Sequence, residues 1–203
     1  MVSLTEKVLK AVENSPSGIA TLDVLKSLRL CDEFTLKTTL SRFCKSGRII
    51  HLKRGVYSSK PMRDVFVAAQ SAFGGYLGFS SALYIHKLIT EVPFSITIVT
   101  PSTSALKVFP PYEFRAISMK KKAVGFENVE DKIVSTRAKT LFDCLYLERY
   151  SVEPEKLIGA YMVMPLSHDE IREFDSYVQR FIPKGKRRRF ERAKERILGN
   201  RTV

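Results

Sequence analysis

The chain has 203 residues, of which 44% are apolar and 27% charged, a balance typical of globular proteins and unlike disordered or membrane-spanning chains. Its formal net charge of +13 lies entirely at the two ends. Residues 1–60 carry 11 Lys/Arg against 5 Asp/Glu, residues 61–183 carry 14 of each, and residues 184–203 carry 9 against 2. This distribution predicts three segments: a basic first domain (1–60), a neutral domain (61–183) and a basic helix or tail (184–203).

The three cysteines are far apart and no Cys-x-x-Cys or Cys/His cluster accompanies them. The sequence therefore indicates neither a zinc site nor a disulfide scaffold. Glu6 stands where a signal peptide has its apolar core, and no apolar run approaches the length of about 18 residues that a membrane span needs. We expect a cytoplasmic protein with reduced thiols, no metal, no cofactor and no membrane partner.

The first sixty residues carry the signals of three short helices. Ser3 and Glu6 form a predicted capping box at the start of the first. Thr21 is placed to cap the second. The third is predicted to follow Asp32 and to run to about Ser46, where the next residue, a glycine, supplies a left-handed end.

The two sides of this third helix differ in chemistry. At about 100° per residue, Leu36, Leu40 and Phe43 fall on one side. The other side carries hydroxyl groups and long cations, and the segment Thr35–Lys45 contains no acidic residue. A surface helix with a purely structural role usually mixes Glu and Lys, which gain i,i+4 pairs. Hydroxyls among cations suit a helix in the major groove of DNA, touching bases and phosphates.

A short β-hairpin is predicted directly after this helix. Strands are expected at 48–52 and 56–58 around Lys53-Arg54-Gly55, because Gly55 allows the positive φ of a tight turn. Three helices followed by a hairpin is the order of a winged helix-turn-helix, with Thr35–Lys45 as the recognition helix and Lys53 and Arg54 at the tip of the wing. Such folds also serve as protein-interaction modules, but the acid-free face and basic tip favour DNA.

The neutral middle reads as an α+β domain without internal repeats. A helix at 62–73 is expected to end at Gly74-Gly75. A proline-rich connection separates two alternating strands, 94–100 and 112–119. The remaining strands are expected at 76–79, 124–127 and 132–134, and the remaining helices at 80–88, 135–150, 154–164 and 167–181. The whole chain is thus predicted to be α+β, with an N-terminal winged helix-turn-helix, a mixed α+β domain and a basic C-terminal helix.

Signals of catalysis are weak in this middle segment. Gly78-Phe79-Ser80 resembles the start of a nucleophile elbow, but Ala82 stands where the last glycine is required. No Walker-type phosphate loop and no paired carboxylates for Mg²⁺ occur. We interpret His86 as a hydrogen-bonded structural histidine, and Lys139 and Asp143 as a surface ion pair. The prediction is therefore that the protein is not an enzyme.

The last twenty residues combine positive charge with helical periodicity. Phe190, Ala193 and Ile197 repeat at helical spacing, which predicts a docked amphipathic helix rather than a loose tail. The run from Lys186 to Arg189 precedes this stripe. The sequence leaves two readings open for the run: contact with DNA beside the main site, or simple solvation.

Three motifs in a fixed order carry a family resemblance. They are "GRIIHLKRGVY" at 47–57, "YLGFSSALYIHKL" at 76–88 and "STRAKTLFDCL" at 135–145. They resemble, in turn, the wing of the AbiEi antitoxin family, its strand followed by a Ser-Ala-Leu-Tyr-x-His-x-Leu helix, and its Thr/Ser-x-x-Arg-Thr-Leu-x-Asp element. Lys139 departs from the usual Arg, and the basic segment beyond Arg180 has no counterpart in the family.

The resemblance implies an antitoxin of an abortive-infection toxin–antitoxin system. It implies an N-terminal winged helix that represses the protein's own operon, and a C-terminal domain that counters a nucleotidyltransferase-like toxin. Such systems are regarded as type IV, in which the two proteins need not bind each other. The expected partners are double-stranded operator DNA and, functionally, that toxin; a homodimer is left open.

The candidate site residues are all DNA contacts, with no catalytic, cofactor-binding or metal-binding residue among them. Two other functions stay open. One is a ligand-sensing winged-helix regulator without an antitoxin role, and the other is a metal-dependent nucleic-acid enzyme, against which the missing carboxylate pairs argue. The candidate DNA contacts are Thr35, Lys37, Thr38, Ser41, Arg42, Lys45, His51, Lys53, Arg54, Lys186, Arg187, Arg188 and Arg189.

Overall fold

The computed structural model describes residues 3–199. The fold is α+β, as predicted, with a mixed sheet and helices. The chain divides into two compact units, Met1–Gly74 and Gly75–Val203. The helix expected at 62–73 therefore belongs to the first unit, and the basic C-terminal helix belongs to the second.

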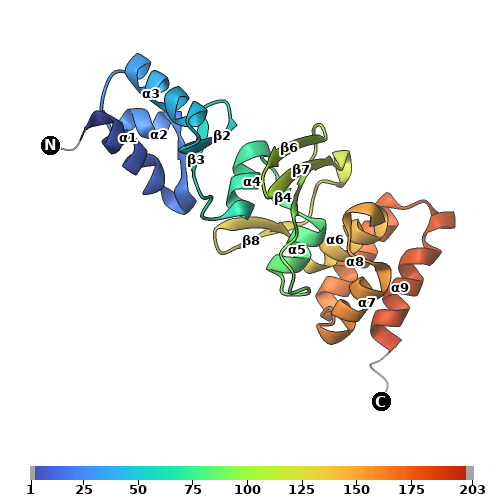
Figure 1. Ribbon diagram of the computed structural model, residues 1–203. Coiled ribbons are helices and arrows are strands. Elements are labelled where there is room, and N and C mark those ends of the chain that lie inside the picture. Colours follow the sequence, from blue (N-terminus) through green and yellow to red (C-terminus); the bar gives the residue numbers. More distant parts are fainter. Residues whose placement is uncertain (1–2, 200–203) are drawn as a thin grey trace. The chain divides into compact units, whose positions relative to one another are not determined.

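The first unit combines helices with a small antiparallel sheet (Figure 1). Its strands lie in the order β1-β3-β2, so β3 is central. Strand β1 was not predicted, because three residues are too few to show an alternating pattern. The elements are α1 (Leu4–Glu13), a 3-10 turn η1 (Pro16–Gly18), β1 (Ile19–Thr21), α2 (Leu22–Ser27), α3 (Glu33–Lys45), β2 (Ile49–Lys53), β3 (Val56–Ser59) and α4 (Val65–Phe73).

Side-chain caps begin the first three helices where the sequence places them. The Ser3 hydroxyl accepts from the Glu6 amide, the Thr21 hydroxyl caps α2 and the Asp32 carboxylate caps α3. The predicted capping box at Ser3 is only half formed, because the Glu6 carboxylate pairs with Lys10 at 3.2 Å. Apolar residues of the three helices, β1 and β2 then form one core: Val8, Leu9, Val12, Ala20, Leu25, Leu36, Leu40, Phe43 and Ile49.

The β2–β3 hairpin is tied to the helices at its turn. Gly55 has φ +73°, a conformation that side-chain-bearing residues rarely adopt. The Leu22 amide at the start of α2 donates to the Gly55 carbonyl over 2.8 Å. A bulge between His51 and Lys53 shifts the register just before the turn. The position of the turn is therefore set by α2 as well as by the two strands.

The second unit holds a six-stranded mixed sheet, ordered β6-β7-β5-β4-β9-β8. Strand β5 pairs with β7 and β4 with β9 in parallel, whereas the other neighbours are antiparallel. Its strands are β4 (Tyr76–Leu77), β5 (Ser95–Thr100), β6 (Ala105–Phe109), β7 (Tyr112–Ser118), β8 (Phe126–Val129) and β9 (Lys132–Ser135). Its α-helices are α5 (Phe79–Ile85), α6 (Arg137–Tyr146), α7 (Pro154–Val163), α8 (His168–Phe181) and α9 (Arg188–Leu198), with 3-10 turns η2 (Lys120–Lys122), η3 (Glu148–Tyr150) and η4 (Lys184–Lys186).

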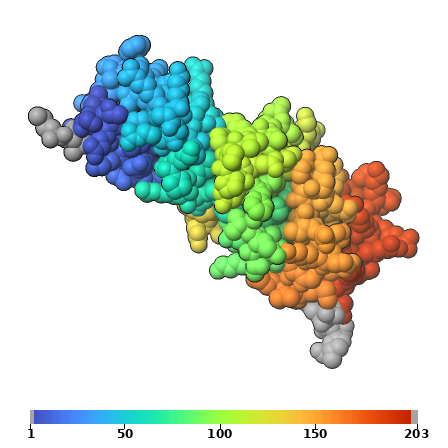
Figure 2. Space-filling model, in the orientation of Figure 1, coloured from blue at the N-terminus to red at the C-terminus, as the bar shows by residue number. Residues whose placement is uncertain are grey.

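Helix α6 forms the centre of the second core. All of its residues from Ala138 to Leu145 are buried. The Phe142 ring contacts the rings of Tyr177 and Phe181 on α8 and Phe190 on α9. Helix α9, red in Figure 2, lies against the orange helical layer, and its stripe of Phe190, Ala193 and Ile197 is buried. The predicted docking of this helix is confirmed.

Residues 3–199 contain no membrane-spanning helix, no metal-binding cluster and no disulfide. None of the helices there combines the length and the apolar character that crossing a bilayer requires. No cluster of three or more His, Cys, Asp or Glu side chains in that range could hold a metal ion. The three cysteines are free, and Cys144 is buried.

Candidate nucleic-acid interface

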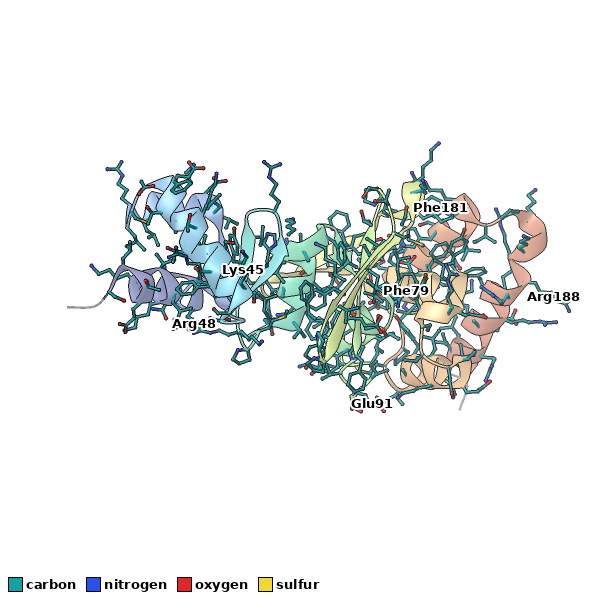
Figure 3. All side chains as sticks on the ribbon, turned by 45° about the horizontal axis from the view of Figure 1, so that its top comes forward. Lys45, Arg48, Phe79, Glu91, Phe181 and Arg188 are labelled. Carbon is teal, nitrogen blue, oxygen red and sulfur yellow. The ribbon has the colours of Figure 1, made fainter. Side chains whose placement is uncertain are left out.

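The outer side of α3 is polar and open along its carboxyl-terminal half. Leu36, Leu40 and Phe43 are buried beneath it, as the periodicity predicts. Ser41, Arg42 and Lys45 are exposed on the other side, and Thr38 is half-buried. In Figure 3, Lys45 marks the end of α3, and Arg48 lies just beyond it, before the hairpin.

The amino-terminal turn of α3 is held by acids that lie outside Thr35–Lys45. The Asp32 carboxylate accepts from the backbone amide of Thr35 at 2.9 Å and from its hydroxyl at 2.6 Å. Glu33 pairs with Lys37 and with Lys26 of α2, both at 2.6 Å. The hydrogen bonds and charges of these two ammonium groups lower the pKa of Glu33 to about 2. The expectation of an acid-free face is therefore wrong for Thr35 and Lys37.

Four cations on α3 and in the hairpin stay open to a ligand. Within residues 3–199, no ion pair or side-chain hydrogen bond engages the charged ends of Arg42 and Lys45 on α3, or of Lys53 and Arg54 in the hairpin. All four side chains are exposed. The guanidinium of Arg48, by contrast, lies 5.1 Å above the centre of the Phe43 ring. The last turn of α3 and the hairpin tip thus present uncompensated positive charge.

A cleft of about 510 Å³ lies between α2, α3 and the hairpin, and the acidic Asp23 lines it from α2. Lys37 lines it from α3, and His51 and Arg54 line it from the hairpin. The His51 ring lies 5.3 Å from the ring of Tyr57, which forms part of the same wall. The fold therefore brings together three of the predicted contact residues from two elements. Tyr57 was not predicted as part of the site. The available signal was its place in an alternating strand, where it points to the opposite side from its buried neighbours Val56 and Ser58.

Two of the four cations in the basic run after α8, Arg187 and Arg189, make contacts within the second unit. The Arg187 guanidinium donates to the carbonyls of Ile182 at 2.9 Å and Gln179 at 2.8 Å, which end α8. Arg189 pairs with Glu148 at 3.0 Å. DNA contact by Arg187 is disfavoured, because its guanidinium already donates to two backbone carbonyls. The charge of Arg189 is partly neutralised by Glu148. Lys186 and Arg188 are exposed.

The interpretation of Lys139 and Asp143 as a surface ion pair is wrong. Both side chains are 0% exposed, and the Lys139 ammonium bonds to Asp143 Oδ1 inside the core. Burial lowers the pKa of Lys139 and raises the pKa of Asp143 to about 6. Asp143 Oδ2 is buried and has no hydrogen-bond partner within residues 3–199. The pair is therefore part of the buried core around α6 and not a solvent-exposed ion pair.

His86 ends α5 and serves the structural role predicted for it. Its Nε2 lies 2.7 Å from the Ser135 carbonyl oxygen of β9. Burial lowers the pKa of the imidazole, so the ring is neutral near pH 7 and donates to that carbonyl. The side chain therefore links α5 to the sheet.

A second cleft, of about 370 Å³, gathers hydroxyl and guanidinium groups in the second unit. Ser95 and Thr97 of β5 line it together with Arg115 of β7 and Arg149 of η3. Ser95 Oγ is buried and lacks a hydrogen-bond partner within residues 3–199. Arg115 is bonded to Glu113 at 3.1 Å, which compensates part of its charge. These groups suit a small polar anion.

Comparison with models of protein families gave no match, and comparison with curated proteins found no significant similarity. The candidate site is therefore defined by its own geometry. Its most exposed part is the set of four open cations, Arg42, Lys45, Lys53 and Arg54, beside the hydroxyls of Thr38 and Ser41. We refer to these six residues as the basic face.

Proposed function

We propose that the first unit is a winged helix that binds double-stranded DNA, and that the protein is a transcriptional repressor. The observation that carries this proposal is the basic face, in which four exposed cations that have no partner among residues 3–199 lie on one helix and one hairpin tip. Helix α3 is the recognition helix and β2–β3 is the wing. A helix that buries one side in a small core and exposes a polar, basic side fits the major groove, and a basic hairpin tip suits the neighbouring phosphates.

The residues of the basic face divide into two roles. Thr38, Ser41 and Arg42 lie along the exposed side of α3, and their hydrogen-bonding groups read base edges. Lys45, with the two cations at the hairpin tip, holds phosphates. Lys37 contributes less than the sequence suggests, because DNA contact requires it to leave Glu33.

We propose further that the repressor is the antitoxin of a nucleotidyltransferase-like toxin in the cytoplasm. The support is the resemblance of the three motifs to the AbiEi family. Two of the motifs lie in the second unit, at β4–α5 and at β9–α6. A nucleotidyltransferase-like reading frame directly downstream of the gene, whose toxicity ends on co-expression of this chain, is the expected result. Unchanged toxicity would remove the antitoxin role and leave the repressor.

Salt dependence tests the DNA-binding proposal. If the four open cations neutralise about four phosphates, affinity for upstream DNA falls by about 10² between 50 and 200 mM salt. Fluorescence anisotropy with a labelled duplex measures this slope. Replacing both Lys53 and Arg54 by Ala should lower the slope by about two, whereas Lys121→Ala, an exposed cation of the second unit, leaves it unchanged. A slope near zero, or an equal effect of the Lys121 variant, would contradict the proposal.

The second candidate function is a ligand-sensing regulator. The cleft of about 370 Å³ favours it, because two guanidinium groups meet there with a buried hydroxyl that has no partner in the described part of the chain. A small anion that raises the melting temperature of the wild type, but not of Arg149→Ala, and that also changes operator affinity would support this function. An anion that stabilises the fold without changing operator affinity would contradict it.

A further inference from the structure

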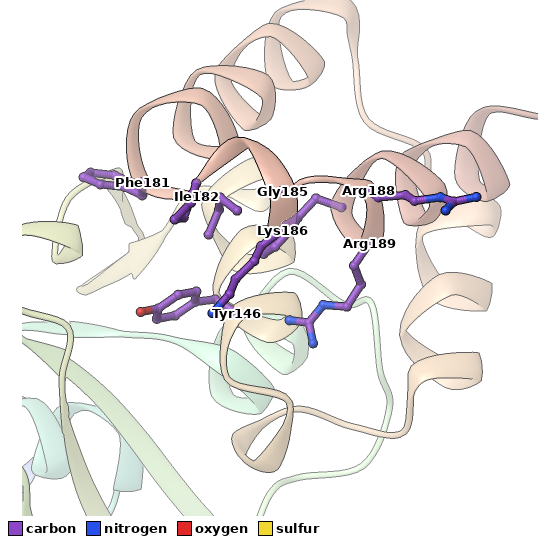
Figure 4. A pocket seen from close by; sticks show the side chains of 9 residues that line it. Tyr146, Phe181, Ile182, Gly185, Lys186, Arg188 and Arg189 are labelled. Carbon is purple, nitrogen blue, oxygen red and sulfur yellow. The ribbon is translucent and has the colours of Figure 1, made fainter.

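A large cleft of the second unit lies where α8 turns into α9. It has a volume of about 740 Å³. Tyr146 at the end of α6 and Phe181 at the end of α8 form aromatic walls, and Lys186 and Arg189 supply positive charge. Figure 4 shows the side chains of Lys186 and Arg189 extending toward the side where the Tyr146 ring lies, while Arg188 extends away.

The walls of this cleft are fixed by packing. The Tyr146 ring is nearly parallel to the buried Phe142 ring, with centres 5.9 Å apart and an interplanar angle of 7°. Phe142 also stacks on Phe190 of α9 at 5.6 Å. Arg187 fastens the connection between the helices through its bonds to the end of α8. The cleft is therefore formed before any ligand arrives, which lowers the entropic cost of binding.

Its charge is positive and only partly compensated. Lys186 has no ion pair within residues 3–199, and Arg189 shares its charge with Glu148 at 3.0 Å. The Lys122 ammonium lies 5.0 Å from the centre of the Tyr146 ring, so a third cation adjoins the same wall. Three cations with one acid, next to exposed parts of two aromatic rings, suit a ligand that joins an anion to a flat apolar group.

We propose that this cleft binds a phosphorylated nucleoside, either as a free nucleotide or as the unpaired end of a nucleic-acid strand. The base lies against Tyr146 and Phe181, and the phosphate is held by Lys186 and Arg189. Aromatic side chains beside cations bind single-stranded nucleic acid in this way, whereas paired bases in a duplex offer no free face. The volume lies within the range of small-ligand sites. The site is separate from the basic face and does not depend on its function.

Isothermal titration of the full chain at one fixed salt concentration tests the site. The titrants are AMP, adenosine, inorganic phosphate, a 5′-phosphorylated single-stranded tetranucleotide and a blunt duplex. AMP or the tetranucleotide should bind saturably and more tightly than adenosine or phosphate alone. Lys186→Ala should weaken this binding about three- to tenfold. Lys184→Ala, two residues away, exposed and outside the cleft, should leave it unchanged.

The aromatic wall has its own test. Tyr146→Phe keeps the ring and should retain binding, whereas Tyr146→Leu should weaken it at least as much as Lys186→Ala, with thermal unfolding as the check that each variant is folded. Preference for AMP identifies a free nucleotide, and preference for the tetranucleotide a strand end. The proposal is overturned if no titrant saturates, if the duplex binds equally well through Lys186, if Lys184→Ala weakens binding as much as Lys186→Ala, or if Tyr146→Leu has no effect.

Discussion

Glu33 decides which part of α3 is open to a polyanion. It joins Lys26 of the preceding helix to Lys37 of its own, so the first turn of α3 is compensated. An interpretation based on Thr35–Lys45 alone misses this compensation. Glu33 lies two residues before that segment, and its second partner, Lys26, belongs to a different helix. The open cations further along the helix were predictable, since their exposure follows from the 3.6-residue period.

The two proposed roles on the basic face predict two kinds of variant. Arg42→Ala should cost about 1–3 kcal/mol on the operator and relax the preference for one base position. Lys53→Ala should weaken operator and unrelated duplex by the same factor, because phosphates carry no sequence. Competition binding with single-base operator variants measures both effects. Identical behaviour of the two variants would contradict this division.

The buried Lys139–Asp143 pair predicts strong coupling between two residues. Lys139→Met alone leaves a carboxylate buried without its partner and should cost about 3–5 kcal/mol in the free energy of unfolding. The double variant Lys139→Met with Asp143→Leu should regain most of that loss, since burying two charges is itself costly. Urea unfolding of both single variants and the double variant measures the coupling energy. Additive effects would contradict it.

Acid titration gives the pair a second signature. The pKa of Asp143 is raised from 3.8 to about 6, so the folded state binds this proton more tightly than the unfolded state does. The associated stability is present below pH 3.8 and is lost as the pH rises through about 6. The wild type should therefore lose stability relative to the double variant over that window.

At the scale of elements, the buried and periodic segments were predictable and the edge strand was not. Helices α8 and α9 follow their apolar stripes closely, whereas α6 is shorter than predicted and is buried on all sides from Ala138 to Leu145. Strand β6 was expected to be a proline-rich connection, because it lies at the sheet edge and leaves Leu106 and Val108 exposed. Pattern analysis relies on one buried face, which such a strand lacks. The burial of Lys139 was not predicted for a related reason. The i,i+4 spacing of a Lys and an Asp is the same whether the pair faces solvent or the core.

Helix α9 should behave as part of the core. Phe190 is 3% exposed and contacts Phe142 and Phe174, so Phe190→Ala should cost about 3–5 kcal/mol. Arg192→Ala, exposed on the same helix, should change stability by less than about 0.5 kcal/mol. Denaturant unfolding of the two variants makes the comparison. Equal, small effects would mean that α9 is not docked in solution.

At the scale of the whole molecule, the two units have separate cores and both are basic. Residues 1–74 carry 12 Lys/Arg against 6 Asp/Glu, and residues 75–203 carry 22 against 15. The sequence alone located the basic ends, but it did not show that α4 packs on β2 and β3. The apolar stripe of α4 indicates that one side of the helix is buried, but not which element covers that side.

A fragment of residues 1–74 should fold and bind DNA alone. Its core of nine buried residues includes contributions from all three of its first helices. Circular dichroism should show a cooperative thermal transition, and anisotropy should show the salt slope of the full chain. A fragment of residues 75–203 should fold but lack operator preference. Absence of a transition in the first fragment, or operator preference in the second, would contradict this.

The bond between the Leu22 amide and the Gly55 carbonyl has a consequence for recognition. Together with the pairing of β1 to β3, it anchors the hairpin turn to the segment that joins the first two helices. A loose loop would have to be ordered at the moment of encounter, and the affinity would fall accordingly. Here that ordering takes place once, during folding, so in the proposed complex Lys53 and Arg54 approach the duplex from a fixed base and only their side chains need to settle.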